Sequence, residues 1–152
     1  MPADEITSVS STFFYDRLAG YAPIQAAGSK GYHDLEIPQA DTATERAALY
    51  PCVLIGPPVW EQNGKGNGNV IIWAIGNVEV VAIGLSTDFR KLEAIAKHFY
   101  PRLHGFFGDT SNGGYINSSD WIRPVRLPQT TEDVTFLRIG GLYRVKARLS
   151  ST

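Results

Sequence analysis

The side chains that most often bind metals or act as nucleophiles are few in this sequence and are not grouped. Its three histidines, His33, His98 and His104, share no ligand spacing with one another or with Cys52, the single cysteine. A zinc site needs several ligands at motif spacing, so we expect no metal. Cys52 stands in the apolar run 51–56, which predicts a buried thiol that packs as a small hydrophobe.

The remaining polar residues form no recognisable catalytic motif. No Gly-x-Ser-x-Gly elbow and no Cys-x-x-Cys pair is present. Four acids fall in expected loops, where turn formation and solvation explain them: Asp109, Asp120, Glu132 and Asp133. We therefore expect no catalytic residue, no cofactor and no enzyme, since an active site would need residues scattered beyond any local signal.

The glycine-rich stretch 61–69 raises the question of phosphate binding. It reads Glu-Gln-Asn-Gly-Lys-Gly-Asn-Gly-Asn. A phosphate-binding loop needs a Lys-Ser/Thr pair at the start of a helix, whereas a strand is expected here over 70–75. Two Asn-Gly pairs favour a flexible hairpin loop instead.

The totals describe one ordinary globular domain over residues 1–152. Hydrophobic residues make up 43% and charged residues 19%, and the formal net charge is -1. This charge gives no overall electrostatic footprint for nucleic acid or an anionic membrane. The first residues lack the pattern of a signal peptide, and no apolar run approaches the roughly 20 residues of a membrane span. We expect no membrane partner.

A strand followed by an amphipathic helix is expected to form the core. The run 78–85 is apolar and β-branched, and Ser86, Thr87 and Asp88 offer helix N-caps. Apolar residues then recur every three or four positions from Phe89 to Leu103, and Pro101 should end or kink the helix. A second helix is expected over 1–20, its well-formed part starting near Ser8 or Ser10.

The other elements complete an antiparallel sheet. Strands are expected at 52–55 (resuming at 59–60), 70–75, 121–127, 134–139 and 142–149. The pair 76–77 is either a hairpin turn or a bulge, 105–120 is a loop, 128–133 a turn and 140–141 a break. The segment 21–50 should be an irregular arm with at most one short strand near 32–37 and a helical turn or two over 42–49. The fold class is thus α+β, a mixed, largely antiparallel sheet of about five or six strands against two main helices.

The order of these parts resembles the tail terminator, or tail completion, proteins of long-tailed bacteriophages. The matching stretches are Phe-Tyr-Asp-Arg-Leu-Ala-Gly (14–20), Ala-Leu-Tyr-Pro-Cys-Val-Leu-Ile-Gly (48–56), the glycine-rich hairpin, Ser-Thr-Asp opening a helix that closes on Leu-His-Gly (103–105), and Leu-Tyr-Arg-Val-Lys-Ala-Arg (142–148). The segment 21–50 and the insert 109–116 match less well.

The resemblance implies a structural virion protein of the tail neck, assembled in the host cytoplasm. Such proteins form a ring, typically hexameric, on the head-proximal end of the tail tube, stop its growth and join the head. The implied partners are further copies, the tail tube protein, the head–tail connector and DNA in transit. Two alternatives remain, another neck or baseplate component and a small enzyme or ligand-binding domain.

Two sets of residues are the candidates for this role. Five side chains are expected as exposed subunit contacts: Trp60, Lys65, Phe106, Phe107 and Arg123. The last strand alternates an apolar face with a basic one, whose cations Arg144, Lys146 and Arg148 would face either solvent or a lumen.

Overall fold

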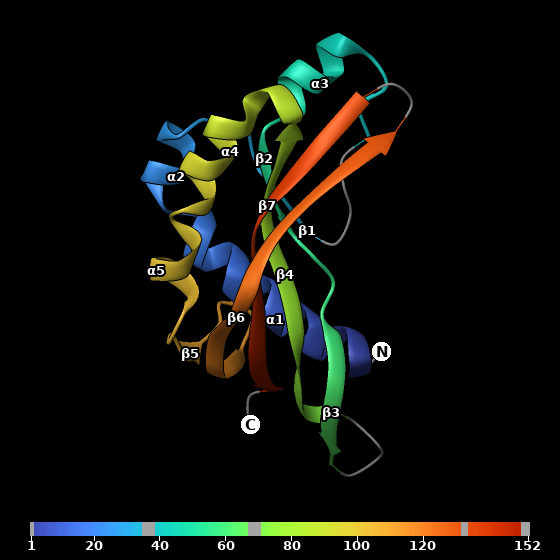
Figure 1. The fold of residues 1–152 in the computed structure, drawn as a ribbon. Helices are drawn as coiled ribbons and strands as arrows, with labels where there is room; N and C mark the ends of the chain where they lie inside the picture. Colours follow the sequence, from blue (N-terminus) through green and yellow to red (C-terminus); the bar gives the residue numbers. More distant parts are fainter. Residues whose placement is uncertain (1, 35–38, 67–70, 132–133, 150–152) are drawn as a thin grey trace.

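One twisted sheet runs the length of the molecule and determines where every other element lies (Figure 1). The computed structural model describes residues 2–34, 39–66, 71–131 and 134–149. Within these residues the sheet has seven strands in the order β1-β2-β4-β7-β6-β5, and β3 pairs with β4 beside β2. The strands are β1 (Tyr32–Asp34), β2 (Cys52–Ile55), β3 (Val59–Lys65), β4 (Ile71–Leu85), β5 (Gly108–Asp109), β6 (Gly114–Thr131) and β7 (Val134–Leu149). Only the β1–β2 pair is parallel, so the predicted α+β class with a largely antiparallel sheet is confirmed.

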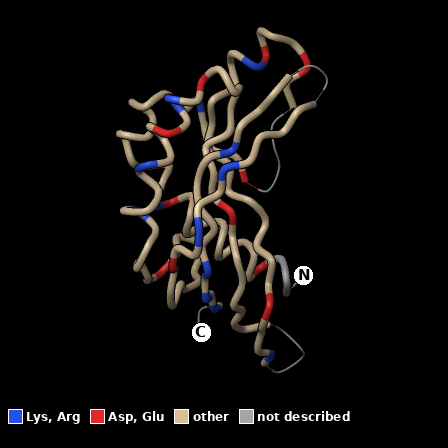
Figure 2. Tube along the Cα trace, in the orientation of Figure 1, with Lys and Arg blue, Asp and Glu red and all other residues tan. Residues whose placement is uncertain are grey.

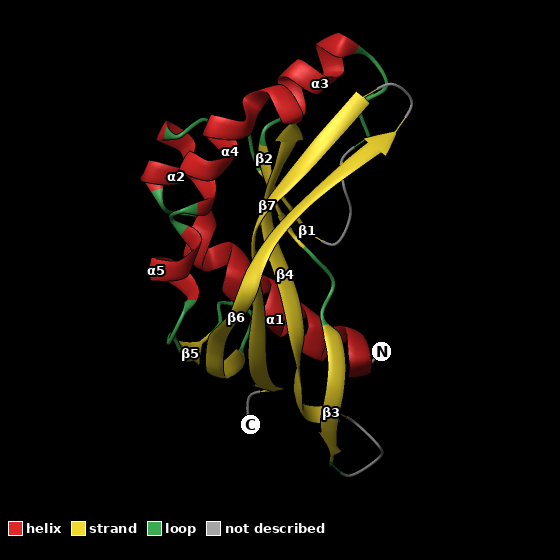
Figure 3. Cartoon of the chain, in the orientation of Figure 1, coloured by secondary structure: helices red, strands yellow, loops and turns green. Residues whose placement is uncertain are grey.

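Helices cover one face of this sheet (Figure 3). They are α1 (Pro2–Ala19), α2 (Ala22–Ala26), α4 (Phe89–Ala96) and α5 (Phe99–Leu103), whereas α3 (Ala43–Leu49) lies at one end. The main core forms between these helices and the sheet, around fully buried side chains such as Phe14, Leu92 and Val145. A smaller cluster on the opposite face joins Tyr50, Cys52 and residues of β4 and β6.

Helix α1 forms as predicted and begins earlier than Ser8. Ile6, Val9, Phe13 and Leu18 are buried against the sheet, and Gly20 follows the last helical residue. Proline is tolerated in a first helical turn, which lets the helix start at Pro2.

The predicted long helix after β4 is broken into two, with the break upstream of Pro101. The 3-10 turn η2 (Ser86–Asp88) leads into α4, which ends at Ala96, and α5 starts at Phe99. A proline removes the hydrogen bond to the carbonyl four residues earlier and its ring clashes with that group. That carbonyl belongs to Lys97, the residue that directly follows the end of α4 at Ala96.

The structure decides between the alternatives at 76–77 and corrects the predicted break at 140–141. β4 passes through Gly76 and Asn77 as one long strand and not as a hairpin, and β7 passes through Gly140 and Gly141 without a break. A Cβ on Gly140 would overlap the carbonyl oxygen of Val80, so this glycine permits close strand contact. β6 begins at Gly114, inside the predicted loop 105–120.

The segment 21–50 contains more regular structure than the predicted irregular arm. It holds α2, a strand β1 within the expected range, and α3. It also packs on its own subunit, because Ile24 is fully buried and the Lys30 amide donates to the Pro51 carbonyl oxygen at 2.8 Å. Residues 35–38 of this segment lie outside the described residues.

The predicted hairpin loop 61–69 is also shorter than expected. Strand β3 continues to Lys65, and Gln62, Asn63 and Gly64 pair with β4. Cross-strand hydrogen bonding therefore overrides the local turn preference of Asn-Gly. Residues 67–70 lie outside the described residues.

Candidate functional site

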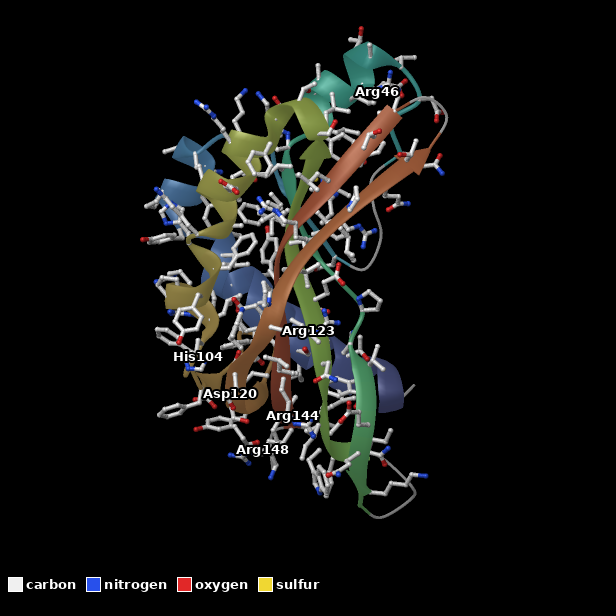
Figure 4. The ribbon with its side chains drawn as sticks, in the orientation of Figure 1. Arg46, His104, Asp120, Arg123, Arg144 and Arg148 are labelled. Atoms are coloured by element: carbon white, nitrogen blue, oxygen red, sulfur yellow. The ribbon has the colours of Figure 1, made fainter. Side chains whose placement is uncertain are left out.

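The face of the sheet opposite the main helices carries a row of charged and aromatic side chains. Neighbouring residues on a strand point to opposite faces, and Tyr143, Val145 and Ala147 are buried toward the helices. We call the opposite side the open face and define it by Glu61, Trp73, Glu79, Tyr115, Asp120, Arg123, Arg138, Arg144, Lys146 and Arg148. The lysines and arginines follow β6 and β7 (Figures 2 and 4).

Two of the open-face cations form ion pairs within the subunit. Arg144 Nη1 lies 2.9 Å from Glu61 Oε2, and Asn77 Nδ2 donates to Glu61 Oε1 at 2.8 Å. The hydrogen bond and charge of Arg144 lower the pKa of Glu61. Arg138 Nη1 donates to Glu79 Oε1 at 3.2 Å. These pairs fix the side chains across β3, β4 and β7.

Two further cations lie over aromatic rings. Lys146 Nζ lies 5.5 Å from the centre of the Trp73 ring, and the Arg148 guanidinium lies 4.4 Å from that of Tyr115. Such contacts are attractive because an aromatic face carries negative charge density. The predicted basic row of Arg144, Lys146 and Arg148 is therefore present, and each member contacts a side chain of its own subunit.

Arg123 is the remaining open-face cation. It is exposed on β6, next to the bulge between Trp121 and Arg123, and it forms no ion pair among the residues that the structure describes. Asp120 lies directly across from Arg144. The open face thus combines cations, acids and aromatic rings, and so offers contacts to a polar macromolecular surface.

The predicted contact residues are not gathered at one place. The prediction of exposure is wrong for Trp60, whose Nε1 donates to Thr7 Oγ1 at 3.2 Å, and for Phe106, which lies under the Arg17 guanidinium at 3.7 Å. Both rings pack against the main core, which accounts for their partial burial. Lys65 and Phe107 are exposed, but they come from β3 and from the α5–β5 connection, apart from Arg123 (Figure 1).

An exposed aromatic cluster near the α5–β6 contact was not predicted. The rings of Tyr100 and His104 stack at 4.7 Å, and Trp121 meets Tyr100 edge-on at 6.2 Å. The Trp121 amide also donates to His104 Nδ1 at 3.0 Å. Helical spacing of Tyr100 and His104 was a usable signal, but the pairing with β6 was not visible locally.

The described part of the chain shows neither a metal-binding group nor a reactive thiol. Its residues contain no group of three or more histidine, cysteine, aspartate or glutamate side chains placed to hold a metal. Burial raises the pKa of the Cys52 thiol to about 12, which keeps it protonated near neutral pH. No described helix is both long and apolar enough to cross a bilayer.

Comparison with known proteins shows a likeness to a solved structure. No protein-family model matches the chain, and no curated protein matches it. Among solved structures, a chain of the virion of a native gene transfer agent (GTA) particle has the same fold, with a TM-score of 0.67 and 17% sequence identity. The match covers 94% of this chain and 97% of the other. At this identity the likeness establishes the shared fold.

Proposed function

We propose that this protein is a structural component of a phage-like virion. The observation that carries the proposal is the fold likeness to a chain of a gene transfer agent virion, because it spans nearly the whole of both chains. Because that neighbour is a chain of a virion particle, we propose a non-enzymatic role without a cofactor.

We further propose that the protein caps the head-proximal end of the tail tube as a ring, typically hexameric, and offers the head-joining surface. The order of sequence elements supports this role. A closed ring uses two different complementary patches on each subunit. The exposed aromatic cluster of Tyr100, His104 and Trp121 offers one surface for such a contact, and it differs chemically from the charged open face.

The remaining parts of the proposal concern the partners. The tail tube protein and the head–tail connector would bind the two rims of the ring, and the particle would be assembled in the host cytoplasm. Exposed Lys65, Phe107 and Arg123 are the proposed contact residues. Arg144, Lys146 and Arg148 are proposed to face the lumen, where DNA passes during ejection.

The test combines solution mass with electron microscopy. Light scattering over a range of concentrations should detect closed rings, and negative-stain images with purified tail tubes should show density at one tube end only. Tubes grown in the presence of the protein should stop lengthening. Failure to associate with tube ends would contradict the capping role. Binding to the baseplate end would instead assign another structural position in the same particle.

A further inference from the structure

A groove opens at the end of the sheet where the central strand β4 stops. It encloses about 630 Å³ and is bounded by Pro51, Leu85 and the first residues of β7. In the strand register Leu85 pairs with Phe136, the last pairing between β4 and β7. Val134 and Thr135 extend β7 beyond this point and line the groove, so their β4-facing edge has no strand partner in the described register.

Cations from three different elements surround this groove. Lys30 precedes β1, Arg46 lies on α3 and Lys91 on α4, and the one acid among the lining residues described is Asp88. Lys30 and Lys91 are exposed and form no ion pair within the described residues, while Arg46 Nη1 donates to the Asp41 carbonyl oxygen at 3.2 Å. Arg46 lies at the end of the molecule where β7 begins (Figure 4). The described lining of the groove therefore carries three cations and one acid, in a chain whose net charge is -1.

The groove also has apolar walls and hydroxyl groups, which a peptide could contact and a small anion would not. Ala43, Ala47 and Pro51 form apolar walls, and Thr87 and Thr135 supply hydroxyl groups. An unpaired strand edge can accept an extended peptide as an additional strand, with its backbone donating and accepting hydrogen bonds. Alternate side chains of that peptide would point toward the cations or the apolar walls.

We infer that this groove binds an extended acidic segment of a partner protein, which lies along the edge of β7 at 134–135. Main-chain hydrogen bonds to the edge at 134–135 would hold the segment, and its carboxylates would pair with Lys30, Arg46 and Lys91. Taking the partner to be another virion protein rests on the proposed function. The acidic and extended character of the segment is inferred only from the residues that line the groove.

The test uses fluorescence anisotropy of the full chain with a short fluorescein-labelled peptide that alternates glutamate and valine. We expect saturable binding that weakens with salt, and no binding of the matched lysine–valine peptide. The combined K30Q, R46Q and K91Q variant should weaken binding by about tenfold or more, because charge-assisted hydrogen bonds are the stronger ones. A control variant with R90Q and K97Q, which removes an exposed cation on α4 and another directly after it, both outside the groove, should bind as the native protein does.

Three results would overturn the inference. They are equal binding by both variants, equal binding of the lysine peptide, and displacement of the acidic peptide by inorganic phosphate at constant ionic strength. The last result would assign the groove to an anion instead. Tube capping by the K30Q/R46Q/K91Q variant is measured separately, so a failed peptide assay and a failed capping assay are distinguishable.

Discussion

Four of the five cations on the open face have a partner within their own subunit. Arg138 and Arg144 pair with acids, and Lys146 and Arg148 lie over aromatic rings. Exposed ion pairs of this kind contribute little to folding stability. They do hold long side chains in one arrangement, so a lumen lined by this face would present an ordered mixed surface more than a uniformly basic one.

The pair of Glu61 and Arg144 should be visible in a pH titration. The lowered pKa of Glu61 means that the contact stabilises the fold above the ordinary glutamate pKa, and that this contribution is lost as the pH falls through the lowered value. We expect R144Q to raise the Glu61 pKa toward its ordinary value in a carboxyl-carbon NMR titration. R123Q, which removes a cation of the same face, should leave it unchanged. An unaltered Glu61 pKa in R144Q would show that the pair does not form in solution.

The sequence predicted the basic row but not its partners, for a physical reason. Alternation along one strand is local, so Arg144, Lys146 and Arg148 could be assigned to one face from their spacing alone. Glu61 and Trp73 reach that face through strand pairings distant in sequence. One amino-acid sequence does not show which strands pair, so these contacts could not be predicted from it.

At the scale of elements, glycine and proline gave the least reliable sequence signals. Pro101 does disrupt the helix, but one turn upstream of its own position. The pair 140–141 marks a place where β7 lies close to β4, and not the break that a local pattern suggested. The strands 52–55 and 142–149 were predicted well because buried, β-branched or alternating side chains determine them directly.

The glycine at position 140 should tolerate no side chain. We expect G140A to lower the free energy of unfolding by about 1–3 kcal/mol, since the added methyl group would overlap the β4 backbone. G20A is the matched control, because a Cβ there meets no atom within 4 Å, and it should change stability by less than about 0.5 kcal/mol. Urea unfolding measures both. Equal stabilities for the two variants would contradict the close contact.

At the scale of the whole molecule, the fold class could be predicted from the sequence, whereas the binding surfaces could not. Burial patterns determine a sheet covered by helices, whereas the groove at the end of β4 and the aromatic cluster at α5 each combine residues from distant segments. Of the predicted contacts, Trp60 and Phe106 became part of the subunit's own packing. The presence of a large aromatic residue in an expected loop does not show whether its side chain packs into the core or is exposed to solvent.

Phe107 offers a direct test of ring assembly. Phe107 is 69% exposed, and if it contacts a neighbour, F107S should raise the protomer concentration needed for assembly about tenfold without changing the melting temperature. V59S is the control, because Val59 is 66% exposed and is not among the proposed contacts. Light scattering of both variants decides the matter. Unchanged assembly of F107S would remove Phe107 from the interface.

The position of β7 has a consequence for how the molecule folds. This strand comes last of the described strands in the chain, yet it lies between β4 and β6 and is hydrogen-bonded to both. Until β7 has been synthesised, β4 and β6 have no common neighbour and the helices have only part of a sheet to cover. Pairings between distant segments form slowly, and unpaired strand edges favour aggregation. A growing chain therefore cannot complete this sheet before β7 has been synthesised, and chains that still lack β7 are the species most exposed to misassembly.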